Sequence, residues 1–468
     1  MSILKIAVVL LCVSAPLHAQ EWIMEDRVDV QPDGTASTAP YGLGQASISD
    51  DGRWVIFESA KSDLVAGDTN GANDVFIRDR VTQTTRRISV LADGSQVSVG
   101  AGQPDASRDG RFVSFYSGAA LLAEDTNGKA DIYLLDRDSN GNGIFDQPGF
   151  TTLRRISVGP NGAQSAHNAG GARSAVSDDG SSVAFATLAP LVAADNNNKS
   201  DVYVRDLAAE NTLIMSTSDG GTVGNFESPD FFDDPVRISD NGRHVAFSSR
   251  ATNLVPGDSN GYSDVFVRDR DSDGNGIFDE PGNTTIRRAS LEPGGGQVGM
   301  NVRQFDLDPS GQWVAFSYFT SGGNNPNGAD IYLSEHATGS VTPIDFNASY
   351  WANPGATCCG NQYPLLSEDA GVVVFKSSQS YPKQGGGTIT NADVFSWTRD
   401  DGLTNITHFP PPGSGSSSVA AGPIALSANG KYLVIQTVSG STYSTFVYRQ
   451  KDAVDAAVLF KDGFETAD

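Results

Sequence analysis

The sequence predicts an all-β protein, a seven-bladed β-propeller of four-stranded blades that an N-terminal strand closes by completing the last blade. Three observations lead to this prediction. One short phrase returns seven times at intervals of 58 to 70 residues. Each copy is followed by a second run of β-branched and aromatic residues. No stretch shows the period of an amphipathic helix.

The repeated phrase combines a turn with a strand. In its first copy, residues 49–52 (Ser-Asp-Asp-Gly) lead into residues 53–57 (Arg-Trp-Val-Ile-Phe). Asp-Gly and Asn-Gly dipeptides form hairpin turns, because glycine tolerates a positive φ, and β-branched and aromatic residues fill the flanking strands. The marker glycines of the seven copies are Gly52, Gly110, Gly180, Gly242, Gly311, Gly371 and Gly430.

Each unit continues with an Asp that opens a short β-rich run, such as residues 74–77 (Asp-Val-Phe-Ile). One more strand follows, such as residues 85–90 (Thr-Arg-Arg-Ile-Ser-Val). The other runs begin at Asp131, Asp201, Asp264, Asp330 and Asp393, and a run without the Asp ends the series at 445–448. Four short strands in each unit describe one propeller blade.

A propeller must close, or its last edge strand is left exposed. Residues 27–30 (Arg-Val-Asp-Val) and the Asp-Gly pair at 33–34 match residues 87–90 and their own Asp-Gly pair, which belong to the fourth strand of a blade. No first three strands precede residues 27–30, and the seventh unit, 423–450, lacks an obvious fourth strand. We therefore expect the strand at 27–30 to complete the last blade.

The Ser-x-Asp-Gly-x-x-x-x-Phe phrase with its following Asp-[Ile/Val]-[Tyr/Phe] resembles the WD40-like (PD40) repeat of the TolB family of bacterial propellers. The resemblance covers about residues 25–450, and it departs modestly at Arg108 and at Pro309-Ser310. It implies the fold strongly and the function weakly. The family includes partner-binding periplasmic proteins as well as the propeller parts of larger enzymes.

The ends of the chain have a different character. Residues 1–19 combine Lys5, an apolar run at 6–13 and the small-residue site Leu17-His18-Ala19, which is typical of a cleaved export signal. The domains expected are this signal peptide (1–19), the propeller (20–450) and a C-terminal tail (451–468). An exported protein can form disulfides, but Cys358 and Cys359 are adjacent in the sequence. Two interpretations remain: a pair of thiols or a vicinal bridge in a loop, or a redox or ligand-contact site.

The composition limits the partners. With 32 Lys+Arg against 56 Asp+Glu, the formal net charge is −24, so phosphate surfaces are repelled and a nucleic-acid partner is excluded. No stretch other than the short signal approaches a transmembrane length. We expect a periplasmic or secreted monomer that binds a protein or a glycan.

Two units carry an acidic insertion of the same form, at 271–279 and at 138–146. Oxygen side chains at alternate positions followed by Gly can wrap a calcium ion, which takes six to eight oxygen ligands. The form resembles the calcium loops of thrombospondin type 3 repeats and dockerins. That resemblance implies a structural calcium with ligands Asp271, Asp273, Asn275, Ile277 (carbonyl) and Asp279, and a weaker site from Asp138, Asn140, Asn142 and Asp146. The alternative is a hairpin loop that binds no ion.

A shorter phrase, Asp68-x-Asn70-Gly71-x-x-Asp74, recurs at 125–131, 195–201 and 258–264. Its three side-chain oxygens favour Asx turns that bond nearby amides over weak cation binding.

The sequence shows no convergent catalytic motif, and we expect no catalytic residues. There is no G-x-S-x-G elbow, and His167, His244, His336 and His408 lie in different units without metal-ligand spacing, so we expect surface or packing roles for them. The first hypothesis is a non-catalytic binding or scaffold module that calcium stabilises. The alternative is a carbohydrate-active lyase or hydrolase with its site in the central cleft. Fold alone does not choose between them.

Overall fold

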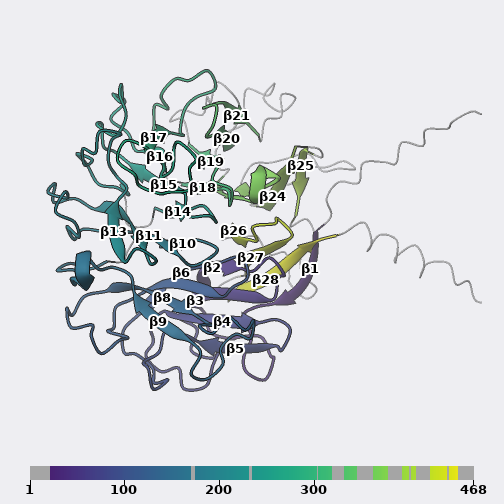
Figure 1. Ribbon diagram of the computed structural model, residues 1–468. Helices are drawn as coiled ribbons and strands as arrows, with labels where there is room; N and C mark the ends of the chain where they lie inside the picture. The colour runs from purple at the N-terminus through teal and green to yellow at the C-terminus, as the bar shows by residue number, and fades with distance from the viewer. Residues whose placement is uncertain are drawn as a thin grey trace, which may run out of the picture.

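The computed structural model describes residues 22–169, 174–230, 234–302, 304–318, 331–344, 362–377, 393–399, 402–406, 422–439 and 442–451. These residues form seven four-stranded antiparallel sheets, which Figure 1 shows arranged as the blades of a ring. Within the described ranges the helical elements are two short 3-10 turns, Pro160–Gly162 and Glu368–Ala370. None of the helices described there is long and apolar enough to cross a membrane. The predicted seven-bladed propeller is confirmed.

In blades 1 to 6 the strands run in chain order from an inner strand at the channel to an outer edge strand. Blade 1 is β2 (Leu43–Ile48), β3 (Trp54–Ser59), β4 (Asp74–Asp79) and β5 (Thr84–Arg87); blade 2 is β6 (Ala101–Ala106), β7 (Phe112–Ser117), β8 (Asp131–Asp136) and β9 (Thr152–Arg155); blade 3 is β10 (Ala175–Val176), β11 (Ser182–Thr187), β12 (Asp201–Asp206) and β13 (Asn211–Ile214); blade 4 is β14 (Val236–Ile238), β15 (His244–Ser249), β16 (Asp264–Asp269) and β17 (Thr285–Arg288).

Blades 5 and 6 follow the same order, and blade 7 takes its outer strand from the N-terminus. Blade 5 is β18 (Gln304–Leu307), β19 (Trp313–Ser317), β20 (Ile331–Glu335) and β21 (Val341–Pro343); blade 6 is β22 (Gln362–Leu366), β23 (Val372–Ser377), β24 (Asp393–Thr398) and β25 (Gly402–Asn405); blade 7 is β26 (Gly422–Leu426), β27 (Tyr432–Ser439), β28 (Thr442–Gln450) and the N-terminal β1 (Trp22–Arg27).

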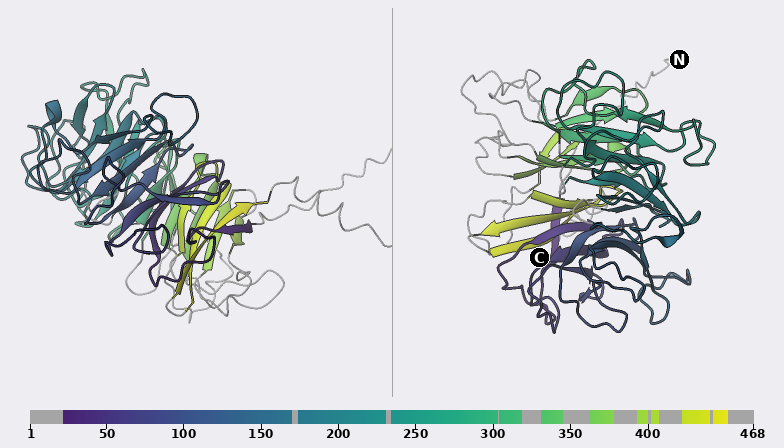
Figure 2. Two further views of the ribbon diagram at one scale, coloured as in Figure 1. Left: turned by 90° about the horizontal axis from the view of Figure 1, so that it is seen from below. Right: turned by 90° about the vertical axis from the view of Figure 1, so that its left-hand side faces the viewer.

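The ring closes through β1, which pairs antiparallel with β28 and so supplies the fourth strand of blade 7. In Figures 1 and 2 the purple β1 lies beside the yellow β28 in each view. The pairing agrees with the expected closure, but the strand is Trp22–Arg27 and not residues 27–30. The repeated Arg-x-x-Val segment begins at the end of an outer strand and continues into a bend, where Val30 and Val90 each form an isolated bridge.

The core lies between the blades, because the two middle strands of each blade are covered on both faces. On β3, Val55 and Phe57 pack toward blade 7, whereas Ile56 packs toward blade 2. The strand therefore reads as a continuous apolar run and not as an alternation. The marker Phe of the repeat faces an aromatic residue on the third strand in blades 1 to 6, as Phe57 faces Phe76 with ring centroids 5.6 Å apart.

The repeated turn has a hydrogen-bonded structure of its own. Ser49 Oγ donates to Asp51 Oδ1 at 2.6 Å and accepts the N–H of Trp54 at 2.9 Å. The same two bonds recur at Ser107, Ser177, Ser239 and Ser427. The serine thus holds the turn that starts the second strand. The turn glycine also lies against the neighbouring blade: a Cβ on Gly110, whose φ is +74°, would come within 3.1 Å of the Trp54 side chain.

Candidate functional site

The repeated turns meet around the axis at one mouth of the channel. Each blade contributes the second residue of its Ser-x-Asp-Gly phrase to this mouth. These residues are Asp50, Arg108, Asp178, Asp240, Pro309, Glu368 and Ala428. A hydrogen bond crosses each of the seven blade boundaries at this level. Examples are Asp50 N–H to the Arg108 carbonyl at 2.8 Å and Asn429 N–H to Asp50 Oδ1 at 2.9 Å. The mouth is therefore a closed belt that joins all seven blades.

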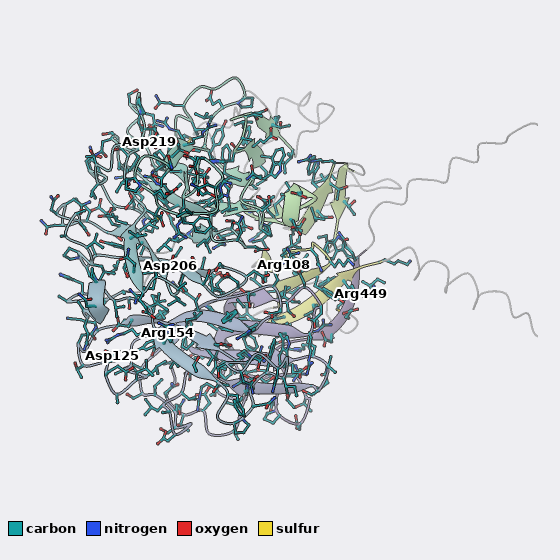
Figure 3. All side chains as sticks on the ribbon, in the orientation of Figure 1. Arg108, Asp125, Arg154, Asp206, Asp219 and Arg449 are labelled. Atoms are coloured by element: carbon teal, nitrogen blue, oxygen red, sulfur yellow. The ribbon has the colours of Figure 1, made fainter. Side chains whose placement is uncertain are left out.

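Arg108 binds three carboxylates from three other blades. Its Nε lies 2.7 Å from Asp50 Oδ2, its Nη1 lies 3.1 Å from Asp240 Oδ2, and its Nη2 lies 2.9 Å from Glu368 Oε2. Its backbone N–H also donates to Asp178 Oδ1 at 2.9 Å. Figure 3 shows Arg108 near the middle of the ring, whereas Asp125 and Arg154 lie toward its outside. One guanidinium thus links blades 1, 2, 4 and 6 across the channel.

The charges at the mouth are unequal, with four carboxylates and one guanidinium in the belt. Burial raises the pKa of Asp240 to about 7. The charge of Arg108 opposes this rise, and the charge of the neighbouring Asp178 adds to it. Burial also raises the pKa of Asp178. Burial works against the charge on Arg108, yet the bonds to Glu368 and Asp50 raise its pKa above the ordinary value. Near neutral pH the belt therefore exchanges a proton at Asp240.

A second polar level lies deeper, on the inner strands. Asp105 accepts the Ser47 hydroxyl at 3.2 Å and the Val176 N–H at 3.0 Å, so it spans blades 1 to 3. Arg237 Nε lies 2.5 Å from Asp306 Oδ1 and thereby joins blades 4 and 5. Burial raises the pKa of Asp105. A cavity of about 150 Å³ lies between these residues and the belt.

An open groove of about 790 Å³ runs from the mouth to the insertion of blade 2. Its polar side, which we call the floor, is lined by the carboxylates of Asp50, Asp51, Asp109 and Asp178 and by the guanidiniums of Arg53 and Arg108, so carboxylates outnumber guanidiniums four to two. Its apolar wall is formed by Trp54, Ile144 and Phe145, and Ile144 is 60% exposed. The groove thus joins an acidic floor to an apolar wall.

The blade 4 insertion brings part of the expected calcium set together. Asp271 accepts the N–H groups of Asn275 and Gly276, each at 3.0 Å, and Asn275 Nδ2 donates to Asp273 at 3.1 Å. Ile277 is exposed. Asp279 instead faces the buried guanidinium of Arg270, with Nη2 to Oδ2 at 2.6 Å. A calcium ion at this loop would have to compete with Arg270 for Asp279, and calcium binding stays a prediction.

The blade 2 insertion repeats this arrangement. Asp138 accepts the N–H groups of Asn142 at 3.1 Å and Gly143 at 2.7 Å, and Asn140 accepts the same Asn142 N–H at 3.3 Å. Asp146 pairs with the buried Arg137, Nη2 to Oδ2 at 2.6 Å, and also with Arg86.

Arg137 and Arg270 belong to a set that we call the interblade arginines, which directly follow the third strand of a blade. Arg137 donates to the Gly110 carbonyl at 2.6 Å, and its guanidinium carbon lies 3.9 Å from the centre of the Trp54 ring in blade 1. Arg270 donates to Gly242 at 2.7 Å and reaches Ser182 of blade 3 at 3.3 Å. Trp54 and Ser182 each begin the second strand of the preceding blade. The other members are Arg80, over Tyr432, and Arg399, over Trp313.

The shorter recurring phrase forms Asx turns. Asn70 accepts the Ala72 N–H at 3.0 Å and donates to Asp74 at 2.9 Å, and Asn127, Asn197 and Asn260 bond in the same way. The terminal Asp of each of these four copies is buried. In blades 1, 2 and 4 an arginine on the outer strand faces it: Arg87, Arg155 and Arg288.

Blade 3 has Ile214 in place of this arginine. Ile214 pairs with Tyr203 of the third strand, just as Arg288 pairs with Phe266 in blade 4. Burial raises the pKa of Asp201 to about 7, whereas the pKa of Asp264, opposed by Arg288, reaches about 6. The Asp201 carboxyl therefore keeps its proton in the folded protein at pH values well above about 3.9, the pKa of an aspartate in the unfolded chain. This group lowers stability progressively as pH rises from about 4 to 7.

We expect Ile214→Arg to lower the pKa of Asp201 by about one unit and to reduce this loss of stability by about 1.4 kcal/mol above pH 7. Carboxyl ¹³C NMR of labelled aspartate measures the midpoint directly. Ile214→Met, which has a long but neutral side chain, is the control. An unchanged midpoint in the Arg variant would contradict the assignment.

Sequence reasoning missed two features of this site. It did not expect the Arg108 cluster, although Arg108 stood out as a departure at the repeat's acidic position. It also placed His244 and His336 apart, but the two rings lie 5.0 Å apart at the boundary of blades 4 and 5. The expected signal peptide, Cys358, Cys359 and nearly all of the 451–468 tail lie outside the described residues.

These features define a seven-bladed β-propeller whose blades meet in an acidic channel mouth. A scan of protein-family models finds no match to this chain, and a search of curated proteins finds none. The TolB-like repeat family is therefore not confirmed at the level of a family.

Among solved structures, the chain is similar to an oligogalacturonate lyase in complex with manganese, with 10% identity, a TM-score of 0.50, and coverage of 94% of this chain and 100% of that one. It is also similar to the oligogalacturonate lyase of Vibrio parahaemolyticus (10% identity, TM-score 0.48, coverage 92% and 97%) and to a putative TolB from Agrobacterium tumefaciens (14%, 0.38, 81% and 98%). At these identities the likeness shows the shared propeller fold.

Proposed function

We propose that the protein is an exported, non-catalytic binding module that presents the acidic mouth and its groove to a partner protein carrying a basic and apolar segment. The observation that carries this proposal is the groove itself. It places four carboxylates, against two arginines, next to an exposed apolar wall in one open space of about 790 Å³. That combination complements a lysine or arginine beside an apolar side chain.

The charged groups around the axis support binding more than catalysis. All three guanidinium nitrogens of Arg108 bind carboxylates, and Arg237 is held by Asp306. A group that polarises or deprotonates a substrate must reach it directly. In the described part of the channel, the two arginines are instead committed to the carboxylates around them. The carbohydrate-active alternative has no comparable observation in its favour.

The aromatic wall also favours a protein over a glycan. Sugars commonly dock on an open aromatic face, but the Trp54 ring is already covered by two guanidiniums. The carbon of Arg53 lies 4.4 Å from its centre and that of Arg137 lies 3.9 Å from it. Ile144 and Phe145 leave an apolar edge that suits an aliphatic side chain.

Export and calcium are parts of the same proposal. The signal-like residues 1–19 support a periplasmic or secreted location. A structural calcium in the blade 4 loop would bind Asp271, Asp273 and Asn275, which already lie within hydrogen-bonding distance of one another or of shared amides. The melting temperature with calcium and with EDTA tests this part.

The binding proposal is tested with a fluorescein-labelled Leu-Lys-Leu-Lys-Leu-Lys peptide in an anisotropy titration of the purified protein. We expect binding that weakens with salt, because the floor carboxylates are exposed to screening. Asp51→Asn/Asp109→Asn removes two charges but keeps the turn acceptors, as Asn241 does in blade 4. It should weaken binding about fivefold. Ile144→Lys should weaken it at least tenfold through lost apolar contact and added repulsion.

The matched control is Asp179→Asn, which alters the same turn position in blade 3 outside the groove and should leave the affinity unchanged. Equal affinity in the Ile144→Lys variant would overturn the proposed site. Binding of the Glu counterpart of the peptide, or of a neutral oligosaccharide alone, would overturn the proposed partner. Release of products from a polysaccharide would establish the enzyme alternative instead.

A further inference from the structure

Three metal-ligating side chains converge at the boundary of blades 4 and 5, away from the channel. His244 begins β15, Asp269 ends β16 and lies opposite His244 in the strand pair, and His336 directly follows β20. One ligand atom from each lies within 4.8 Å of the others. His244 and Asp269 are buried, and His336 is half-buried.

The two histidines occupy the positions of an interblade arginine and its partner. His336 follows its third strand as Arg137 and Arg399 follow theirs, and His244 begins its second strand as Trp54 and Trp313 begin theirs. At those boundaries a guanidinium covers an indole ring. At the boundary of blades 4 and 5, two imidazoles meet edge to face, with an interplanar angle of 72°. A guanidinium offers only donors, whereas a neutral imidazole offers a lone pair.

The His244 side chain lacks the partners that burial demands. It is 2% exposed, its Nδ1 has no hydrogen-bond partner, and its Nε2 lies 3.8 Å from Asp269 Oδ2, beyond hydrogen-bonding distance. A buried imidazole left without a partner costs free energy, and a bound ion removes that cost.

Asp269 accepts three hydrogen bonds and has room for one more on Oδ2. Its Oδ1 accepts Arg243 Nε at 2.7 Å and the Asp271 N–H at 3.0 Å, and its Oδ2 accepts Arg243 Nη2 at 2.9 Å. The remaining lone pair of Oδ2 is on the oxygen nearest His244. Arg243 therefore acts as the outer partner that holds a ligating carboxylate in place. Arg243 and Arg287 oppose a cation here, and Asp269, Asp271 and Asp273 favour one.

We propose that His244, Asp269 and His336 bind one zinc ion, which clamps blade 4 to blade 5 in place of the arginine–aromatic contact. Two imidazoles and a carboxylate are a donor set that zinc prefers and that calcium does not. Tetrahedral zinc requires ligand atoms about 3.3 Å apart, so the present spacing closes by shifts of about 1 Å. Water completes the coordination at the half-buried His336 side.

The test begins with the metal-free protein and cobalt chloride, because cobalt bound to nitrogen ligands in a tetrahedral site absorbs in the visible range. We expect one equivalent of cobalt to produce this band and zinc to displace it. Zinc should also raise the melting temperature in proportion to the logarithm of its free concentration. Absence of the band in the wild-type protein would overturn the proposal regardless of any variant.

The chain supplies its own control variant. His244→Trp/His336→Arg reproduces the Trp54–Arg137 pair, so it should fold and should lose both the cobalt band and the zinc-dependent rise. Asp273→Asn, which alters only the calcium loop, should retain both. Equal zinc binding by the wild type and the double variant would show adventitious binding elsewhere and would overturn the site.

Discussion

Replacing Arg270 with Met should lower the free energy of unfolding by about 3–5 kcal/mol, because it leaves the carboxylate of Asp279 without its partner in a largely buried position. The Arg270 side chain is 0% exposed and that of Asp279 is 13% exposed. The substitution also removes the bond to the Gly242 carbonyl within blade 4 and the bond to Ser182, which joins blade 4 to blade 3. Urea unfolding measured at pH 7 gives the change.

The control is Arg53→Met. Arg53 makes a two-bond pair with Asp79, but its side chain is 39% exposed, so we expect a loss of about 1 kcal/mol or less. Equal losses in the two variants would contradict the assigned role of burial.

The Arg270→Met variant also tests the proposed calcium loop. Without Arg270, Asp279 is released to the loop, so calcium should recover part of the lost melting temperature. The recovery should disappear when Asp271→Ala/Asp273→Ala is added. If calcium changes the melting temperature of neither the wild type nor Arg270→Met relative to EDTA, both acidic insertions are hairpin loops that link blades.

Replacing Arg108 with Leu should lower the free energy of unfolding by about 2–3 kcal/mol near pH 8. Breaking a buried ion pair costs more, but the Arg108 side chain is 27% exposed, so solvent screens part of the loss. Three carboxylates from blades 1, 4 and 6 would lose a common partner.

The loss should depend on pH with a definite sign. The pKa of Asp240 in the folded protein is raised to about 7, so the folded state keeps a proton that the unfolded state has released. Stability from this group therefore falls as pH rises from about 4 to 7. Without Arg108 the pKa of Asp240 rises further, so the deficit of the variant is larger at pH 8 than at pH 5. A deficit that is constant between pH 5 and 8 would contradict the role of Arg108 toward Asp240.

Arg108→Lys keeps the charge but cannot supply three separately directed nitrogens, so it should recover only part of the loss. Full recovery would show that charge alone, and not the three-way geometry, stabilises the mouth.

The sequence by itself determined the number of blades, the order of the strands and the closure of the ring. These properties depend on local chemistry: an Asp-Gly or Asn-Gly turn specifies a hairpin, and apolar β-branched runs specify strands buried on both faces. Seven copies and an unpaired N-terminal match are then enough to place β1 beside β28. Its bounds differed because the matched residues from Val28 onward lie in the bend after the strand.

Only the tertiary structure decided which residues share a site. Asp50, Arg108, Asp240 and Glu368 occupy one repeat position in four blades, and no local pattern shows that a guanidinium is long enough to span the channel. His244 and His336 meet because neighbouring blades press the start of one strand against the end of another. The sequence allows two partners for Asp279: a calcium ion bound by its own loop, or the nearby Arg270. The folded path of the loop turned Asp279 toward the arginine, since a buried guanidinium requires a carboxylate nearby.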